Sequence, residues 1–222
     1  MMEEISDLPV LSPEEIRVLG CLMEKSKTTP EYYPMTLNGL QTACNQKTSR
    51  KPVVQYDENL IINILDSLRK KGLISTVVGG GSRVTKYKHN FAIRFPLLPQ
   101  EIAIFCLLFL RGPLTIGEIK SNSGRLFDFE SLSEIKSILD KLSNDSPAFT
   151  KELPKGPGQK EVRYIHLFTS LTDEQMEEVI NTGSDLTSVD TTNKELQERV
   201  SILENQLLDL RNEFDNLMKE LS

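Results

Sequence analysis

Two stretches of the chain repeat each other, and this repeat restricts the possible fold more than any other feature. Residues 11–22, LSPEEIRVLGCL, align with residues 97–108, LLPQEIAIFCLL. Three further blocks follow in the same order in both copies: TLNGL with TIGEI, ILDSL with ILDKL, and a Tyr-x-His-x-Phe segment that ends at Phe91 or Phe168. Two copies about 80 residues apart indicate a duplicated small domain, because solenoid repeats are shorter and more numerous.

Local signals predict the same elements in each copy. Proline and a Ser-x-x-Glu capping box open a first helix at Ser12, and glycine ends a third helix at Gly72. A glycine turn between two β-prone runs then predicts a hairpin. In the first copy we expect helices from residue 12, over 36–44 and over 57–71, and a hairpin of 73–78 with 84–91. In the second copy we expect helices over 99–111, from 115 and from 131, and a hairpin of 148–153 with 161–168.

Three helices followed by a hairpin is the order of a winged helix, a helix-turn-helix unit with a β-ribbon attached. The predicted fold class is mainly α with small β-hairpins (α+β), as two tandem winged-helix domains followed by a C-terminal coiled-coil helix. The predicted domains are residues 1–95 and 96–170, then an acidic linker over 171–191 and the coiled-coil helix over 192–222.

The coiled coil is predicted from apolar residues that recur in steps of four and three. A complete leucine seam favours self-association into a dimer, and the alternative is that the helix folds back on its own domains. The predicted dimerisation residues are Leu196, Val200, Leu203, Leu207, Leu210, Phe214, Leu217 and Leu221.

The charge distribution points to a cationic first copy. The formal net charge is −6, but residues 171–222 carry −9 and residues 44–94 carry +7. In a winged helix, the turn before the third helix, the outer face of that helix and the wing contact double-stranded DNA. The predicted nucleic-acid-binding residues are Lys47, Arg50, Lys51, Asn59, Asn63, Arg83, Lys86 and Lys88.

Acidic residues on the predicted third helices weigh against DNA binding. Asp57, Glu58 and Asp66 share the first-copy helix with Asn59 and Asn63, so a merely solvated face is the alternative interpretation. The second copy has a neutral to acidic third helix, and its returning strand carries Ile165 and Leu167 between core-facing residues. A strand with two apolar faces needs cover on both sides, which predicts packing against the first copy or a partner protein.

The sequence carries no catalytic signature and no cofactor or metal motif. The glycine loops GGGS and GPG lead into strands, whereas a phosphate-binding P-loop leads into a helix. The three cysteines are widely spaced in apolar helical patterns, which indicates buried thiols. His89 and His166 occupy matching positions of two copies, which favours a hydrogen-bonded structural histidine in each. The acidic start and the absence of a long apolar run predict a cytoplasmic protein without membrane segments.

The stretch TTPEYYPMTLNGLQTACNQKTSRKPVV, residues 28–54, together with RVTKYKHNF and RYIHLF, resembles the YceH-like family of uncharacterised bacterial proteins. The resemblance covers residues 11–221 and implies tandem winged helices with a C-terminal helical extension. The match over ACNQKTSRKPV implies that Asn45, Gln46, Lys47 and Arg50 belong to the most distinctive surface of the family.

Two functions therefore stay open at the level of sequence. The first is a dimeric DNA-associated protein, such as a transcriptional regulator, that contacts phosphate through the first copy. The second is an adaptor or scaffold that binds other proteins, through the second copy in particular, without direct DNA contact. The cationic segment favours the first function, and the acidic third helices with the apolar second hairpin favour the second.

Overall fold

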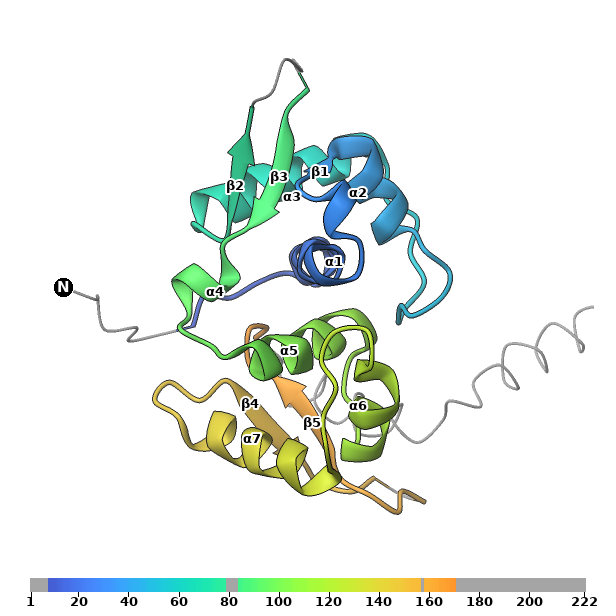
Figure 1. Ribbon diagram of the computed structural model, residues 1–222, viewed down its shortest axis with the longest axis vertical. Coiled ribbons are helices and arrows are strands. Elements are labelled where there is room, and N and C mark those ends of the chain that lie inside the picture. Colours follow the sequence, from blue (N-terminus) through green and yellow to red (C-terminus); the bar gives the residue numbers. More distant parts are fainter. Residues whose placement is uncertain (1–7, 79–83, 157, 171–222) are drawn as a thin grey trace, which may run out of the picture. The chain divides into compact units, whose positions relative to one another are not determined.

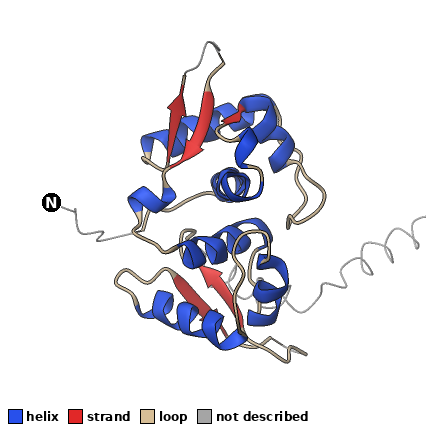
Figure 2. Cartoon of the chain, in the orientation of Figure 1, coloured by secondary structure: helices blue, strands red, loops and turns tan. Residues whose placement is uncertain are grey.

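The computed structural model describes residues 8–78, 84–156 and 158–170. These residues are mainly helical and include two small antiparallel β-sheets (Figures 1 and 2), which confirms the predicted α+β class. The predicted acidic linker and coiled-coil helix lie outside the described residues.

The first repeat contains three main helices, and its three strands form one sheet of order β1-β3-β2, with β1 placed before the second helix. Its first helix starts at the predicted capping box, in which the Glu15 amide donates to Ser12 Oγ and the Ser12 amide donates to Glu15 Oε2. The elements are α1 (Pro13–Thr28), a 3₁₀ turn (Pro30–Tyr32), β1 (Met35–Thr36), α2 (Leu37–Cys44), α3 (Glu58–Lys70), β2 (Ile74–Val77), β3 (Lys86–His89) and α4 (Phe91–Arg94).

The second repeat has the same order of three helices and an antiparallel strand pair. Thr115 and Glu118 form the predicted reciprocal cap at the start of its second helix. Ser131 caps the third helix by accepting from the Glu134 amide. The elements are α5 (Pro99–Arg111), α6 (Ile116–Ser123), α7 (Leu132–Asn144), β4 (Thr150–Leu153) and β5 (Arg163–His166).

The first hairpin differs in detail from the predicted one. The returning strand ends at His89, because the chain turns into the short helix α4, which Phe91 opens with a fully buried ring. Strand β1 was not predicted, since two residues carry no periodic pattern. It pairs with β3 through Met35 and Tyr87, and so adds a third strand to the sheet.

The two repeats pack against each other through α1 and α5. A Cβ on Gly20 of α1 would lie 3.0 Å from side-chain atoms of both Phe109 and Leu110, so the helices approach closely at this glycine. The apolar β5 strand is buried, as predicted from its two apolar faces, and Ile165 is only 6% exposed. The main core therefore combines side chains from both repeats, while a second cluster lies within the second repeat alone.

A cluster of phenylalanines fills the core between the repeats. The rings of Phe91 and Phe168 lie 5.4 Å apart, and Phe168 also packs edge-on against Phe105 and Phe109. Such tilted and edge-to-face pairs contribute beyond their buried area. The residues that end the two Tyr-x-His-x-Phe segments thus meet in one shared core.

A buried glutamate fixes the third helix to the first in each repeat. Glu15 accepts from Lys71 Nζ at 2.6 Å and from Ser67 Oγ at 2.7 Å. Burial alone would raise the pKa of Glu15, but the hydrogen bonds from Lys71 and Ser67 outweigh it and hold that pKa below its usual value. In the second repeat, Glu101 accepts from Lys141 Nζ at 2.7 Å.

His89 is half-buried and His166 is buried, the Nδ1 atom of each has no hydrogen-bond partner, and only His89 has the predicted hydrogen bond. Its Nε2 lies 3.2 Å from Ser26 Oγ. His166 instead packs edge-on against Phe109, with ring centroids 4.8 Å apart, and its Nδ1 is buried without a hydrogen-bond partner. The three cysteines are free and buried, as predicted.

Candidate nucleic-acid interface

The structure describes seven of the eight predicted nucleic-acid-binding residues, and Arg83 lies outside the described residues. Six of the seven reach the surface. Lys47 and Lys51 are exposed in the loop 45–57, Asn59 and Asn63 are exposed on α3, and Lys86 and Lys88 are half-buried on β3.

The structure places the guanidinium of Arg50, one of the predicted nucleic-acid-binding residues, inside the protein and not at the surface. The Arg50 side chain is 0% exposed and makes a bidentate ion pair with Glu24 of α1, at 2.6 and 3.0 Å. It also donates to the Ala43 carbonyl and to Gln46 Oε1. Burial works against its charge, but the hydrogen bonds and attraction of Glu24 raise the pKa of Arg50 above its usual value.

The neighbouring residues of the distinctive ACNQKTSRKPV stretch also hold the loop in place. Asn45 and Tyr56 exchange two hydrogen bonds across the loop, at 2.8 and 2.9 Å. Buried Arg17 of α1 donates to the carbonyls of Cys44 and Pro52. Of the four residues expected at the distinctive surface, Lys47 is exposed, Asn45 and Gln46 are half-buried and bonded within the loop, and Arg50 is buried.

The four lysines that reach the surface form two separate groups rather than one patch. The amide of Lys51 donates to the Leu110 carbonyl at the end of α5, so the loop that contains Lys51 contacts the second repeat. Figure 1 shows this loop and the β2–β3 hairpin on different sides of the first-repeat helices. Lys86 and Lys88 therefore form one group with α2 and α3, and Lys47 and Lys51 form another.

Lys86 lies beside the start of α2. In the sheet, its Cα is paired with that of Thr36, the residue whose hydroxyl caps α2 by accepting from the Gly39 amide at 3.2 Å. The first amides of a helix and an adjacent ammonium group both favour an anion. No carboxylate pairs with Lys86 within the residues that the structure describes.

The matching cation of the second repeat is neutralised by a partly exposed ion pair within the chain. Arg163 of β5 takes the place of Lys86, and Glu118 of α6 takes the place of Gly39. The two side chains make a bidentate ion pair at 2.8 and 3.1 Å, and Arg163 also donates to the Pro113 carbonyl. The alignment of TLNGL with TIGEI already contains this difference, so Gly39 could have been singled out from the sequence.

The outer face of α3 is polar but not cationic at its centre. Asn59 and Asn63 stand one turn apart and are exposed, with Ile62 and Asp66 beside them. Asp66 pairs with Arg69 at 2.9 Å on the surface. Asparagine amides can pair with adenine edges, whereas the cationic side chains lie on β3 and in the loop 45–57.

Neither a metal cluster nor a membrane-spanning helix occurs in the described ranges. They contain no group of three or more histidine, cysteine, aspartate or glutamate residues placed to hold a metal ion. They also contain no helix with the length and apolar character that crossing a bilayer requires.

Comparison with known proteins identifies close relatives over almost the whole chain. A family described as "Protein of unknown function, DUF480" matches residues 11–159. A UPF0502 protein of Shewanella loihica is 41% identical over 215 residues, which cover 95% of this chain and 99% of the relative. A UPF0502 protein of Shewanella oneidensis is 42% identical over 221 residues, covering 96% and 99%. The UPF0502 protein YceH of Escherichia fergusonii is 42% identical over 217 residues, covering 95% and 97%.

Proposed function

The chain belongs to the UPF0502 family of bacterial proteins of unknown function (DUF480), and we propose that it is a DNA-associated protein built from two winged-helix domains. The first domain contacts duplex phosphate through the start of α2, β3 and the loop 45–57. The single observation that carries this proposal is Lys86, a cation beside a helix start whose repeat counterpart, Arg163, is already neutralised by Glu118.

The order of elements supports the winged-helix assignment. Each repeat has three helices followed by an antiparallel strand pair, and the first has a third strand before α2. In winged helices the turn before the third helix, that helix and the wing meet the duplex, and the start of α2 lies beside the wing strand because Thr36 is paired with Lys86. Lys86 and Lys88 lie on the wing strand, and Asn59 and Asn63 lie on the third helix.

The proposed contact is mainly electrostatic. Lys47, Lys51, Lys86 and Lys88 are four described cations that are not committed to a carboxylate of the described residues. Phosphate contacts position a protein on DNA and supply affinity without reading sequence. Since Glu58 and Asp66 share α3 with the two asparagines, we expect modest affinity and weak base preference.

A salt titration of duplex binding tests this function. With four phosphate contacts, log K plotted against log salt falls with a slope of about −3.6. Replacing Lys86 and Lys88 with alanine removes two contacts, so the slope becomes about −1.8, and the Lys47/Lys51 double variant tests the loop group in the same way. The exposed Lys151 of β4 serves as a matched control and leaves the slope unchanged. A duplex that does not bind, or slopes equal in all variants, contradicts the proposal.

The proposed function also includes a dimer that forms through the C-terminal residues with the heptad pattern. This part of the proposal is based on the sequence alone. Two copies would present two first domains to one duplex, which raises affinity through effective concentration. Replacing Leu203 and Leu207 with lysine puts charges into the seam, so we expect monomers in sedimentation analysis. A wild-type chain that sediments as a monomer contradicts the dimer and leaves the phosphate contact to be judged by the salt titration alone.

A further inference from the structure

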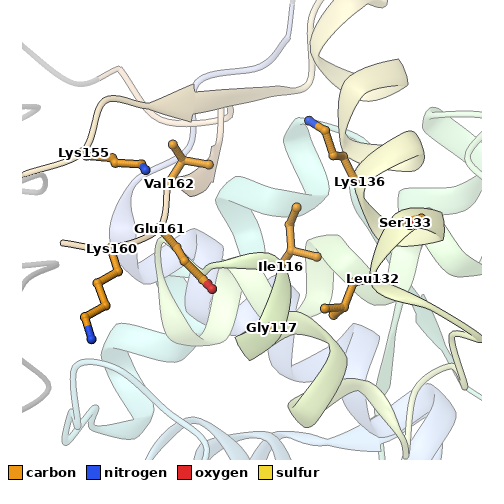
Figure 3. A pocket seen from close by; sticks show the side chains of 9 residues that line it. All are labelled: Ile116, Gly117, Leu132, Ser133, Lys136, Lys155, Lys160, Glu161 and Val162. Atoms are coloured by element: carbon orange, nitrogen blue, oxygen red, sulfur yellow. The ribbon is translucent and has the colours of Figure 1, made fainter.

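A groove on the second repeat lies between the start of α6, the start of α7 and the β4–β5 hairpin (Figure 3). It has a volume of about 430 Å³, within the range that receives a small ligand or a few side chains. Its apolar lining comes from Ile116, Leu132 and Val162, and Leu132 is 53% exposed. An apolar side chain that enters the groove would therefore bury surface that the protein leaves open to water.

The rim of the groove is cationic. Lys136 lies on the α7 side, and Lys155 and Lys160 lie on the hairpin side. Within the described residues, Lys155 and Lys160 have no ion-pair partner, and Lys136 meets only the exposed Asp140 at 3.4 Å. These ammonium groups are free to meet carboxylates of a ligand.

Glu161 is the one acidic residue that lines the groove. Figure 3 shows its carboxylate directed toward Ile116 and Gly117 at the start of α6. One of its oxygens lies 4.0 Å from the place that a Cβ on Gly117 would take. An incoming carboxylate has to share the groove with this charge, so Glu161 limits the affinity for anions.

We propose that this groove binds an acidic peptide segment of a partner protein. A large apolar side chain of the peptide packs on Ile116, Leu132 and Val162, and flanking carboxylates meet Lys136, Lys155 and Lys160. A nucleic-acid backbone fits less well, because its closely spaced phosphates offer no apolar group for the lining and would meet Glu161. The proposal does not depend on DNA binding by the first repeat.

Gly117 allows the groove to be filled without disturbing the fold. A Cβ at this position meets no atom closer than 3.8 Å, and Gly117 lies in the first turn of α6, where a larger residue improves helix propensity. Gly117→Leu therefore places a side chain where the peptide side chain would lie. Gly124→Leu is the matched control, since Gly124 lies at the other end of α6 with no atom near its Cβ position.

Fluorescence anisotropy with the full chain tests the proposal. The probe is a fluorescein-labelled synthetic nonapeptide of alternating glutamate and leucine, and the comparison peptides replace every leucine with serine or every glutamate with lysine. We expect the first peptide to bind and both comparison peptides to bind at least about tenfold more weakly, a difference of about 1.4 kcal/mol. Gly117→Leu and the Lys155→Glu/Lys160→Glu pair weaken binding about tenfold or more, while Gly124→Leu leaves it unchanged. Glu161→Gln strengthens it.

Four results would overturn the proposal. The first is that wild-type protein fails to bind the glutamate–leucine peptide. The second is that Gly117→Leu binds this peptide as tightly as wild type. The third result is that the groove variants weaken binding of a DNA duplex and leave peptide binding unchanged, which would make the groove a nucleic-acid contact. The fourth is an affinity that falls as protein concentration rises, because a second copy of this chain would then occupy the groove. Salt slopes of the Lys86/Lys88 variants judge the DNA proposal separately.

Discussion

The two repeats share one framework and differ in what they leave unpaired. In both, a buried glutamate in the first turn of the first helix is held by the third helix, through Lys71 or Lys141. At the junction of the second helix with the returning strand, however, the first repeat pairs Lys86 with Thr36 and has a glycine at position 39, whereas in the second repeat Arg163 forms an ion pair with Glu118. Duplication thus preserved the contacts that hold the helices together, while one substituted residue decides whether a surface cation is available.

The loops between the second and third helices differ as well. In the first repeat, residues 45–57 are held by Arg17, Arg50 and Asn45, whereas the shorter segment 124–131 connects α6 to α7 in the second. The longer loop reaches α5 through the Lys51 amide. The first repeat therefore depends on buried guanidinium groups that have no counterpart in the second.

The largest effect is expected from removing Arg50. Arg50→Ala removes the bidentate pair with Glu24, which keeps only the Lys25 ammonium at 3.2 Å, and it also removes the bonds to Ala43 and Gln46. We therefore expect a loss of up to about 3–5 kcal/mol in the free energy of unfolding. Urea denaturation followed by circular dichroism measures this loss. Arg69→Ala breaks the exposed pair with Asp66 and should cost at most about 1 kcal/mol. Equal stability of the two variants would show that the buried pair does not hold the loop.

The free energy of unfolding is expected to depend on pH through the histidine of each repeat. Burial lowers the pKa of His166 to about 4, and burial with the nearby charge of Lys27 lowers that of His89 to about 4. In the unfolded chain both histidines take up a proton near pH 6.5, whereas in the folded protein they do so only near pH 4. Protonation between these two pH values therefore favours unfolding, so the contribution of the histidines to the free energy of unfolding is fully present above pH 6.5. It falls as the pH drops toward 4, by about 1.4 kcal/mol per pH unit for His166.

Chemical denaturation between pH 4 and 7 checks this dependence. Glutamine does not titrate in this range, so His166→Gln should remove the contribution of His166 to the slope of unfolding free energy against pH, even if the variant is less stable overall. His89→Gln should remove the contribution of His89 in the same way. An unchanged slope in His166→Gln would mean that this histidine is protonated in the folded protein.

A smaller effect is expected where the repeats meet. Gly20→Ala puts a methyl group 3.0 Å from side-chain atoms of Phe109 and Leu110, so overpacking of the α1–α5 contact costs about 1–3 kcal/mol. The higher helix propensity of alanine returns about 1 kcal/mol of this. Gly124→Ala, which meets nothing, should not destabilise. Thermal unfolding of the two variants measures the difference, and a Gly20→Ala variant as stable as wild type would contradict close packing of the repeats.

Sequence reasoning located most helices because their ends are determined locally. Ser12, Thr36, Asp57, Thr115 and Ser131 all cap helices at the predicted positions. The repeat also identified the two hairpins, and the two apolar faces of β5 correctly predicted burial. Features that depend on distant partners were missed, namely strand β1 and the turn into α4 at Phe91.

The candidate site was predicted less well for the same reason. A run of basic residues does not reveal which side chains are neutralised, and Glu24 lies far from Arg50 in sequence. Comparing the repeats residue by residue would have separated Lys86 from Arg163, because Gly39 and Glu118 are aligned in the sequence itself. The separation of Lys47 and Lys51 from β3 needed the structure, since a hydrogen bond to Leu110 sets the position of the loop.

The most direct test of the central claim converts the first repeat into the second at one residue. Gly39→Glu recreates the Thr-x-x-Glu cap and places a carboxylate beside Lys86, and its Cβ requires only that the Thr36 hydroxyl, 3.3 Å away, moves slightly. Gly39→Gln has nearly the same shape without the charge. In a salt titration of duplex binding, we predict that Gly39→Glu binds more weakly with a slope reduced by about 0.9, while Gly39→Gln keeps the wild-type slope. Equal affinity and slope for Gly39→Glu and wild type would contradict the claim that an unpaired Lys86 contacts phosphate.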